Sequence, residues 1–337
     1  MSDRRVAVVG ATGAVGRTMI EVLSQRDFPL AELRLLASAR SAGSTVSTRW
    51  GEIKVENLED ADPSGIDIAL FSAGADRSRA FAPAFVTAGA IVVDNSSAFR
   101  RDPEVPLVVA GVNDHAIGSH RGIVSNPNCT TMALMVAVGP LHRAAGLERM
   151  VATSYQSVSG SGQRGIDELS RQVDLLGRDR ATLVSGGWSD PGGDLYARPI
   201  GWNVLPFAGS ETELGYTDEE WKLVNESRKI LETPDLEVEP TCVRVPVMVG
   251  HGIAATLWFQ RSLEVSEAIR LLSDAPGGEL WLDRVPTPLD CAGRDEVLIG
   301  RVRETLGRPG GINLWAVGDN LRKGAAVNAV QIAERIS

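Results

Sequence analysis

A glycine-rich turn between an apolar run and a helical segment constrains the fold of this chain more than any other feature. Four apolar residues at 6–9 lead directly into Gly10, Gly13 and Gly16, and Ala14–Gln25 then has the spacing of an amphipathic helix. Glycines at such a junction permit a tight turn and a close backbone approach to a pyrophosphate, which the helix N-terminus stabilises. A purely structural turn would explain the glycines alone, but the flanking strand and helix favour a dinucleotide-binding site.

The first third of the chain repeats this alternation of short apolar runs and helical segments. We expect strands at residues 6–9, 33–37, 66–71 and 91–94, helices at 14–25 and 77–88, and a hairpin at 45–58 that turns at Gly51. Strands separated by helices at this spacing imply βαβ crossovers. The predicted fold class is therefore α/β, with an N-terminal doubly wound parallel sheet of the Rossmann type.

Beyond residue 128 the predicted strands become longer and richer in β-branched and aromatic residues. They lie at 150–158, 241–249 and 253–262, with helices near 165–176 and 218–231 between them. This pattern predicts a second, α+β domain with a largely antiparallel sheet and helices on one face. We place the first domain at residues 1–128, completed by a C-terminal helix at 319–337, and the second at 129–318. Residues 185–215, rich in Gly and Pro, should form a long irregular connection.

Composition excludes several classes of protein. The chain has 337 residues and a net charge of −9 without a basic tract, so nucleic acid is an unexpected partner. No apolar stretch approaches the ~20 residues that a membrane helix needs. We expect no signal peptide, because only Ser-Asp-Arg-Arg separates Met1 from the first predicted strand. Three widely spaced cysteines suggest neither a disulfide framework nor a metal site, and Cys242 and Cys291 are expected to be packing thiols. We expect a cytoplasmic, metal-free protein.

Cys129 follows a short β-prone stretch that stops at Asn126-Pro127-Asn128, and a long apolar helical segment begins there. Asn128 is a good N-cap, so the thiol is expected at the first position of the helix. Unpaired backbone N–H groups and the helix dipole favour a negative charge there, and they can lower the pKa of a thiol from its usual ~8.5. From this context alone, a nucleophile and an ordinary buried cysteine are equally good interpretations.

The end of the second predicted strand bears on the choice of cofactor. An NAD site would place Asp or Glu there to bind the ribose hydroxyls, but this chain has Ser38-Ala39-Arg40-Ser41. A guanidinium between two hydroxyls suits a 2′-phosphate, because Arg pairs with phosphate in a forked geometry. NADP is therefore favoured over NAD, with an ordinary surface charge as the alternative for Arg40.

Four further segments contain more polar residues and glycines than packing requires. They include Arg100, Gln156, Glu219 with Lys222, and Arg244 with His251. Arg244 lies in an apolar run, and a buried guanidinium must be paired because an unpaired buried charge costs several kcal/mol. Either a bound carboxylate or an internal salt bridge would satisfy it. Glu219 and Lys222 share a helix face at a spacing of three, which is also a common exposed ion pair.

Together with the Asn-Cys-Thr-Thr segment at 128–131, these segments resemble aspartate-β-semialdehyde dehydrogenases over essentially the whole chain. The most specific matches besides that segment are Tyr-Gln-x-Val-Ser-Gly from Tyr155 and Arg-Val-Pro-Val…Gly-His from Arg244. The resemblance implies a second domain like that of glyceraldehyde-3-phosphate dehydrogenase, used for catalysis and dimerisation. It also implies reduction of L-aspartyl-4-phosphate by NADPH to L-aspartate 4-semialdehyde and phosphate. This step serves lysine, threonine, methionine and diaminopimelate biosynthesis.

The resemblance assigns roles to single residues. Cys129 would form the thioester, His251 would act as general acid/base on the hemithioacetal oxygen, and Gln156 would position the substrate. Substrate-binding positions would be Asn128, Glu219 for the ammonium, Arg244 for the α-carboxylate, and Arg100 and Lys222 for the phosphate. Cofactor-contacting positions would be Gly10, Thr12, Gly13, Ala14, Val15, Ser38, Arg40, Ser41, Ser159, Gly160 and Asn320. Glu220 competes with Glu219, and Arg101 with Arg100, because each is a direct neighbour of the same type.

Two alternative functions and the oligomeric state stay open from the sequence. A phosphorylating dehydrogenase of the N-acetylglutamyl-phosphate reductase type would use similar chemistry, but an acylated amine needs no acid facing an ammonium group. A non-catalytic NADP-binding paralogue would be expected to lose the cysteine or the histidine, and this chain keeps both. The family implies a homodimer, and further pairing into a tetramer is left open. Residues 185–193 match no family pattern.

Overall fold

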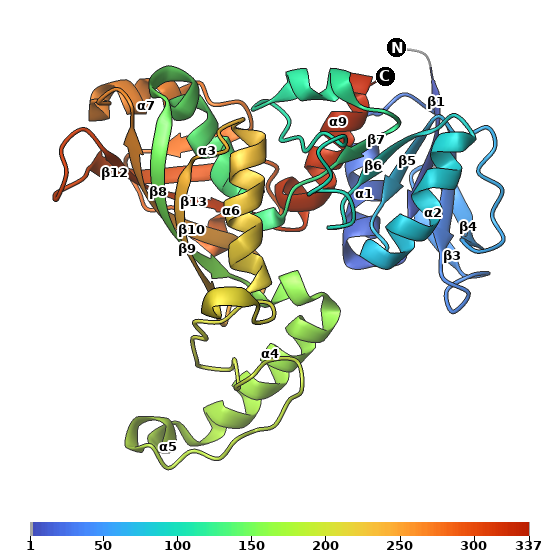
Figure 1. The fold of residues 1–337 in the computed structure, drawn as a ribbon. Coiled ribbons are helices and arrows are strands. Elements are labelled where there is room, and N and C mark those ends of the chain that lie inside the picture. The colour runs from blue at the N-terminus through green and yellow to red at the C-terminus, as the bar shows by residue number, and fades with distance from the viewer. Residues whose placement is uncertain (1–2, 337) are drawn as a thin grey trace. The chain divides into compact units, whose positions relative to one another are not determined.

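The computed structural model describes residues 3–336, drawn as a ribbon in Figure 1. The chain forms two compact units. The first holds the chain up to Gly139, Asn225–Pro234 and the chain from Leu321, and the second holds Pro140–Val224 and Asp235–Asn320. The division falls inside a helix, so the domain boundary that we expected at residue 128 stays a prediction.

The first unit contains a seven-stranded sheet with the order β3-β4-β2-β1-β5-β6-β7. All neighbours are parallel except the hairpin of β3 and β4. The strands are β1 (Arg4–Val9), β2 (Leu30–Ala37), β3 (Thr45–Thr48), β4 (Gly51–Asn57), β5 (Ile68–Phe71), β6 (Ile91–Asp94) and β7 (Ile123–Ser125). This is the doubly wound sheet that the alternating pattern predicted.

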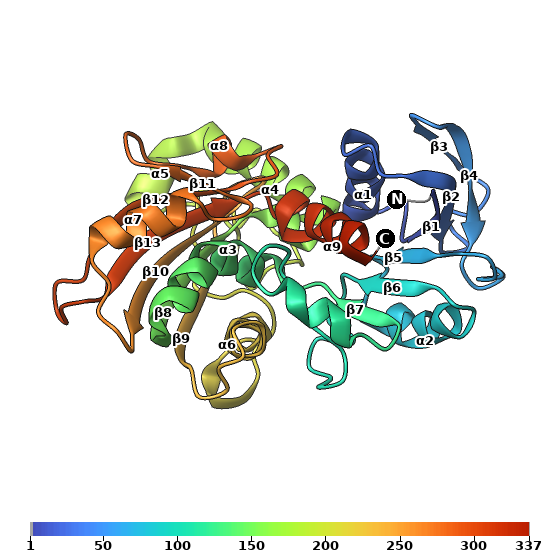
Figure 2. The same cartoon turned by 90° about the horizontal axis from the view of Figure 1, so that it is seen from above.

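Helices cover both faces of this sheet, as Figure 2 shows for α1 (Ala14–Gln25) and α9 (Asn328–Ile336) on one face and α2 (Ala75–Thr87) on the other. Side chains alternate along a strand, so Val6 and Val8 pack in the core with α1 and α9, whereas Ala7 and Val9 pack in the core with α2. Burial on both faces explains why the parallel strands are continuous apolar runs.

The C-terminal segment differs from the single helix expected at 319–337. A π-helical turn, Arg322–Val327, precedes α9, and residues 319–321 are not helical. The turn is fully buried from Lys323 to Val327. The predicted helix therefore begins too early, although α9 does pack against the first sheet as predicted. Residue 337 lies outside the described residues.

The second unit contains a six-stranded sheet with the order β11-β12-β13-β10-β8-β9. The three central pairs are antiparallel and the two outer pairs are parallel, so the sheet is mixed rather than purely antiparallel. Its strands are β8 (Leu147–Gln156), β9 (Glu237–Arg244), β10 (His251–Phe259), β11 (Gly278–Trp281), β12 (Val297–Glu304) and β13 (Ile312–Gly318). Its other helices are α4 (Gln163–Leu176), α5 (Arg180–Ser185), α7 (Val265–Ser273) and α8 (Pro288–Cys291), with a short 3-10 helix at Val158–Ser161.

Two helices pass from one unit to the other along the chain, α3 (Cys129–Ala145) and α6 (Asp218–Ile230). The strand expected at 241–249 was wrong beyond Arg244. Pro246 has no N–H to donate, and the Val247 N–H closes a tight turn onto the Val245 carbonyl at 2.8 Å.

The connection after α5, visible at the foot of Figure 1, is irregular as expected. Among the described residues it contains no helix or strand from 186 until the 3-10 turn Glu213–Gly215, and only isolated bridges tie it to its surroundings. Within residues 3–336, no helix is both long and apolar enough to cross a membrane.

Candidate active site

Cys129 is the first residue of α3, directly after β7 and the Asn-Pro-Asn turn. The Asn128 side chain caps the helix, because its Oδ1 accepts a hydrogen bond from the Thr130 N–H at 3.0 Å and its carbonyl accepts one from the Met132 N–H at 2.9 Å. The thiol is partly exposed. The predicted cap and the predicted place of the thiol in the helix are therefore confirmed.

The other two cysteines differ from Cys129 in being fully buried. Burial raises the pKa of the Cys242 thiol to about 12, and burial together with the charge of Asp319 raises that of Cys291 to about 12. A thiol must ionise to act as a nucleophile. Both are packing residues, as the sequence indicated, and no disulfide joins any of the three within the described part of the chain.

Arg100 is fixed beside the residues that precede Cys129. Its side chain is 9% exposed, its Nε donates to the Asn126 carbonyl at 2.9 Å, and a terminal nitrogen donates to the Asn95 carbonyl at 2.9 Å. The other terminal nitrogen forms an ion pair with Glu226 at 3.0 Å. Arg101 is exposed. The geometry therefore favours Arg100 over its neighbour as the functional arginine.

The glycine turn has the shape that a dinucleotide needs. Gly10 has φ +87°, and a Cβ there would lie 2.3 Å from the Ser72 carbonyl oxygen. A Cβ on Gly16 would lie 2.2 Å from the Gly10 carbonyl oxygen, so helix α1 can pack closely only with glycine there. Gly13 is the N-cap of α1, and no side chain makes a capping hydrogen bond at this end of the helix. The backbone of this turn is consequently open to a phosphate group.

The residues expected at the ribose end of the cofactor gather beside this turn. Thr12 Oγ1 donates to Ser41 Oγ at 3.2 Å, which joins the glycine turn to the loop after β2. Arg40 is exposed, and no hydrogen bond or ion pair engages its side chain among residues 3–336. No acidic side chain lies between Ser38 and Ser41.

In the second unit the strand register aligns three of the predicted residues. Gln156 at the end of β8 lies opposite Arg244 at the end of β9 and opposite His251 at the start of β10. Directly opposite residues on neighbouring strands project from the same face. The sequence could not show this row, because the three residues are far apart along the chain.

His251 is 1% exposed, and its Nδ1 accepts the Ser157 backbone N–H at 3.1 Å. The neutral ring therefore carries its proton on Nε2. Burial, together with the nearby Arg244 guanidinium, lowers the pKa of His251 to about 3. The imidazole is thus neutral at physiological pH and presents a hydrogen-bond donor.

Asn320 holds the surroundings of this histidine. Its Oδ1 accepts from Ser157 Oγ and Ser159 Oγ, both at 3.1 Å, and from the Gly250 N–H at 2.9 Å. Ser157 was not among the predicted site residues, although it lies within the Tyr-Gln-x-Val-Ser-Gly segment. Its position between two predicted site residues, Gln156 and Ser159, could have identified it from the sequence.

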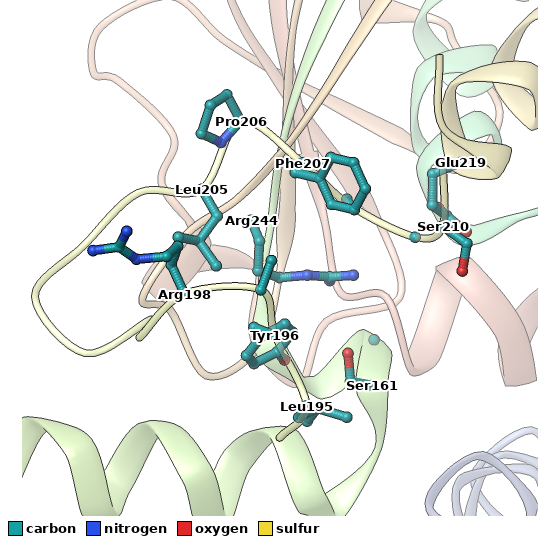
Figure 3. Close-up of a pocket in the computed structure, with 14 residues that line it drawn as sticks. Ser161, Leu195, Tyr196, Arg198, Leu205, Pro206, Phe207, Ser210, Glu219 and Arg244 are labelled. Atoms are coloured by element: carbon teal, nitrogen blue, oxygen red, sulfur yellow. The ribbon is translucent and has the colours of Figure 1, made fainter. Parts of the chain in front are cut away.

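A cavity of about 390 Å³ opens beside Arg244 and Glu219 (Figure 3). Arg244 is 7% exposed, and one terminal nitrogen donates to the Ser157 carbonyl at 2.7 Å, while its Nε has no partner in the described structure. No carboxylate of residues 3–336 forms a salt bridge with it. A Cβ on Gly160 would lie 3.1 Å from the Arg244 guanidinium and 3.3 Å from His251 Nε2, so both side chains converge on this glycine.

Most of the remaining cavity wall comes from the irregular connection, with Leu195, Tyr196, Arg198, Leu205, Pro206 and Phe207 drawn in Figure 3. The Arg244 guanidinium lies 5.9 Å from the centre of the Tyr196 ring. The sequence missed this contribution, because a segment rich in Gly and Pro has no periodicity from which side-chain directions can be read.

Glu219 is part of the cavity wall and Glu220 is not. The Glu220 carboxylate is buried and accepts the backbone N–H groups of Thr217 at 2.7 Å and Cys242 at 2.9 Å. Glu219 instead accepts from Lys222 Nζ at 2.6 Å and Gln156 Nε2 at 3.4 Å. Burial opposes its ionisation, but the charge of Lys222 brings the pKa of Glu219 below its ordinary value, so the carboxylate stays ionised.

The predicted residues thus form two groups, each within one unit. The first unit holds Arg100, Asn128, Cys129 and the cofactor positions up to Ser41, and the second holds Gln156, Ser159, Gly160, Glu219, Lys222, Arg244, His251 and Asn320.

Two family models match the chain. The model described as semialdehyde dehydrogenase, NAD binding domain, matches residues 5–120, and the model described as semialdehyde dehydrogenase, dimerisation domain, matches residues 138–323. The chain is 51% identical to the aspartate-semialdehyde dehydrogenase of Streptomyces akiyoshiensis, over 99% of this chain and 98% of that protein. It is 50% identical to the aspartate-semialdehyde dehydrogenase of Mycolicibacterium smegmatis, over 98% of each.

Solved structures give the same result. The structure of aspartate semialdehyde dehydrogenase II from Vibrio cholerae, complexed with ASA, matches with a TM-score of 0.93 at 44% identity and covers 100% of this chain and 98% of that one. The fold class and the enzyme class predicted from the sequence are confirmed by these matches. The chain therefore belongs to the aspartate-semialdehyde dehydrogenase family.

Proposed function

We propose that this chain is an NADP-dependent enzyme that interconverts L-aspartyl-4-phosphate and L-aspartate 4-semialdehyde through a thioester on Cys129. The observation that carries the proposal is the cavity of the second unit, where the buried guanidinium of Arg244 has no carboxylate partner in the described structure and the ionised Glu219 lies in the same wall. An α-amino acid carries a carboxylate and an ammonium group, so it needs one cation and one anion of this kind.

The residues of the first unit fit a dinucleotide with a 2′-phosphate. Gly10 and Gly16 leave room that a Cβ would fill, and the N-terminus of α1 suits the pyrophosphate. Thr12, Ser41 and the unpaired Arg40 would hold the ribose phosphate. When bound, the cofactor supplies or accepts the hydride that interconverts the thioester and the aldehyde.

Cys129 forms and breaks the bond to the substrate carbon. In the reducing direction its thiolate attacks the acyl carbon, the C–O bond to the phosphate breaks, and phosphate leaves with the electron pair while the thioester remains. The helix N-terminus, capped by Asn128, stabilises the thiolate. We propose that Arg100 and Lys222 bind the phosphate group. One terminal nitrogen of Arg100 donates one N–H to Glu226 and the other donates one N–H to the Asn95 carbonyl, so each keeps a second N–H for the phosphate.

His251 acts on the oxygen of the former carbonyl group, and Gln156 beside it positions the substrate. Because Nδ1 accepts the Ser157 N–H, the neutral imidazole presents its Nε2–H to this oxygen as a hydrogen-bond donor, and transfer of a proton to the oxygen requires the imidazolium form. To act as a base, Nε2 must instead carry the lone pair, which requires the other tautomer, in which the Ser157 N–H is released. A neutral imidazole can also stabilise a developing oxyanion as a hydrogen-bond donor.

The alternative substrate of the N-acetylglutamyl type is not favoured, because Glu219 in the cavity wall suits a charged ammonium group rather than an acylated amine. The test mixes the protein with phosphate, oxidised cofactor and either aspartate semialdehyde or N-acetylglutamate semialdehyde and follows the absorbance of the reduced nicotinamide. We expect turnover with aspartate semialdehyde and NADP⁺. Turnover with N-acetylglutamate semialdehyde alone would contradict the proposal, and a preference for NAD⁺ would contradict the role of Arg40.

A homodimer built through the second domain agrees with the dimerisation description of the family model that matches residues 138–323. A cytoplasmic location and further pairing into a tetramer stay predictions from the family resemblance.

A further inference from the structure

We infer that Glu226 is a positioning residue for the nucleophile, because its carboxylate fixes the backbone directly before Cys129 and holds Arg100 at the same time. No sequence pattern pointed to this role, and the kinetic part of the test rests on the proposed function. Glu226 is 3% exposed and lies in the C-terminal half of α6. All of its contacts described here are within the first unit.

The two carboxylate oxygens of Glu226 have different partners. Oε2 accepts the Asn128 backbone N–H at 2.7 Å, and Oε1 accepts from the Arg100 guanidinium at 3.0 Å. Arg100 in turn donates from Nε to the Asn126 carbonyl at 2.9 Å. Residues 126–129, here called the cysteine loop, are therefore held on both sides of Pro127 by one buried ion pair.

The contact to Asn128 replaces part of a standard helix cap. The N–H of an N-cap residue has no partner within its helix, and in a capping box a Glu or Gln three residues later accepts it. In α3 that position is Thr131, whose hydroxyl has no hydrogen-bond partner in the described structure. Glu226 supplies the missing carboxylate from a different helix. The start of α3, and with it the thiol, is consequently fixed by α6.

The charges of this arrangement are balanced. A lone buried carboxylate next to Cys129 would oppose formation of the thiolate, whereas the Arg100–Glu226 pair carries no net charge. Lys229, one turn further along α6, adds to the same anchorage by donating to the carbonyls of Arg100, Asp102 and Val105 at 2.9, 2.6 and 2.7 Å. The C-terminal half of α6 therefore holds the cysteine loop through Glu226 and the chain after Arg100 through Lys229.

Glu226→Gln tests the inference, because glutamine keeps the length of the side chain but offers an acceptor to only one of the two donors. We expect kcat to fall on the order of 10²-fold, as a displaced reacting group causes, while KM for aspartate semialdehyde changes little. Hydrogen exchange in the full-length protein gives a second readout that needs no activity. We expect faster exchange in the peptide that covers the cysteine loop, with the peptide covering β1 unchanged.

The matched control is Glu56→Gln, which breaks the two-bond ion pair with Arg34 in the same unit and should leave kcat and the cysteine loop unchanged. If Glu226→Gln is not recovered folded, Glu226→Asp keeps the charge that Arg100 needs but is too short for both contacts, and the same two results are expected. Unchanged exchange in the cysteine loop, or faster exchange spread evenly over the unit with normal kcat, would overturn the inference. Should the wild-type protein prove inactive on aspartate semialdehyde, the proposed function fails and the exchange measurement still decides the role of Glu226.

Discussion

Replacement of Arg244 with Lys separates the charge of the guanidinium from its shape. One terminal nitrogen already donates to the Ser157 carbonyl at 2.7 Å, and the remaining N–H groups of the two terminal nitrogens can form two parallel bonds with the substrate carboxylate. Lysine keeps the charge but cannot supply this fork. The variant therefore loses at least one charge-assisted hydrogen bond, worth about 1.5–3 kcal/mol.

A loss of this size lowers kcat/KM for aspartate semialdehyde by about 10–150-fold. The carboxylate is remote from the reacting carbon and is bound equally in the ground and transition states, so most of the loss should appear as a higher KM. Initial rates followed through the absorbance of the reduced nicotinamide give both constants. Arg198→Lys is the control, because Arg198 lines the same cavity but is exposed and contacts the Trp188 ring. Equal KM values for Arg244→Lys and the wild type would refute the assignment of the carboxylate to Arg244.

Three further outcomes are expected. Cys129→Ala should abolish turnover while NADPH, titrated by its fluorescence, binds as it does to the wild type; residual turnover in this variant would exclude the thioester. Arg40→Ala should raise KM for NADP⁺ by about tenfold or more, the value of one charge-assisted phosphate contact, and leave KM for NAD⁺ unchanged; parallel changes would place the 2′-phosphate elsewhere. His251 has a folded-state pKa below its unfolded value, so its contribution to stability is complete above about pH 6.5 and is lost as the pH falls toward 3. Urea unfolding at pH 7 and at about pH 4.5 should show the wild type losing about 2–3 kcal/mol more than His251→Asn, and equal losses would contradict the buried, neutral imidazole.

The sequence predicted the parts of the fold that depend on local pattern. Helix α1 begins and ends where its apolar spacing indicates, and β6 has the bounds predicted for it, residues 91–94. The strands of the parallel sheet were recognised because burial on both faces makes them continuous apolar runs. By contrast, β12 has a buried first half and a mostly exposed second half, and its register depends on β13, so no local pattern predicted it.

In the candidate site, too, local motifs predicted some residues, and only the folded structure identified the others. Motifs located Cys129 and His251, but the row formed by Gln156, Arg244 and His251 exists only through strand register. Glu226 could not be found in the sequence because its partner Arg100 is 126 positions away along the chain.

The choice between Glu219 and Glu220 could have been made from the sequence alone. Thr217 and Glu220 have the spacing of a capping box at the start of α6, and the structure contains both of its hydrogen bonds. A glutamate used in this way is not available to a substrate. The capping pattern would therefore have selected Glu219 over Glu220 without any knowledge of the fold.

The thioester mechanism is tested most directly by trapping the acylated enzyme. Aspartate semialdehyde and NADP⁺ are mixed with the protein in the absence of phosphate, so that the thioester forms and nothing displaces it rapidly, and the quenched protein is digested and analysed by mass spectrometry. If Cys129 forms the thioester, an aspartyl group is expected on the peptide that contains Cys129, and it should disappear when phosphate is added before quenching. Reduced nicotinamide formed without any acylation of Cys129, or acylation of Cys242 or Cys291 instead, would contradict this mechanism.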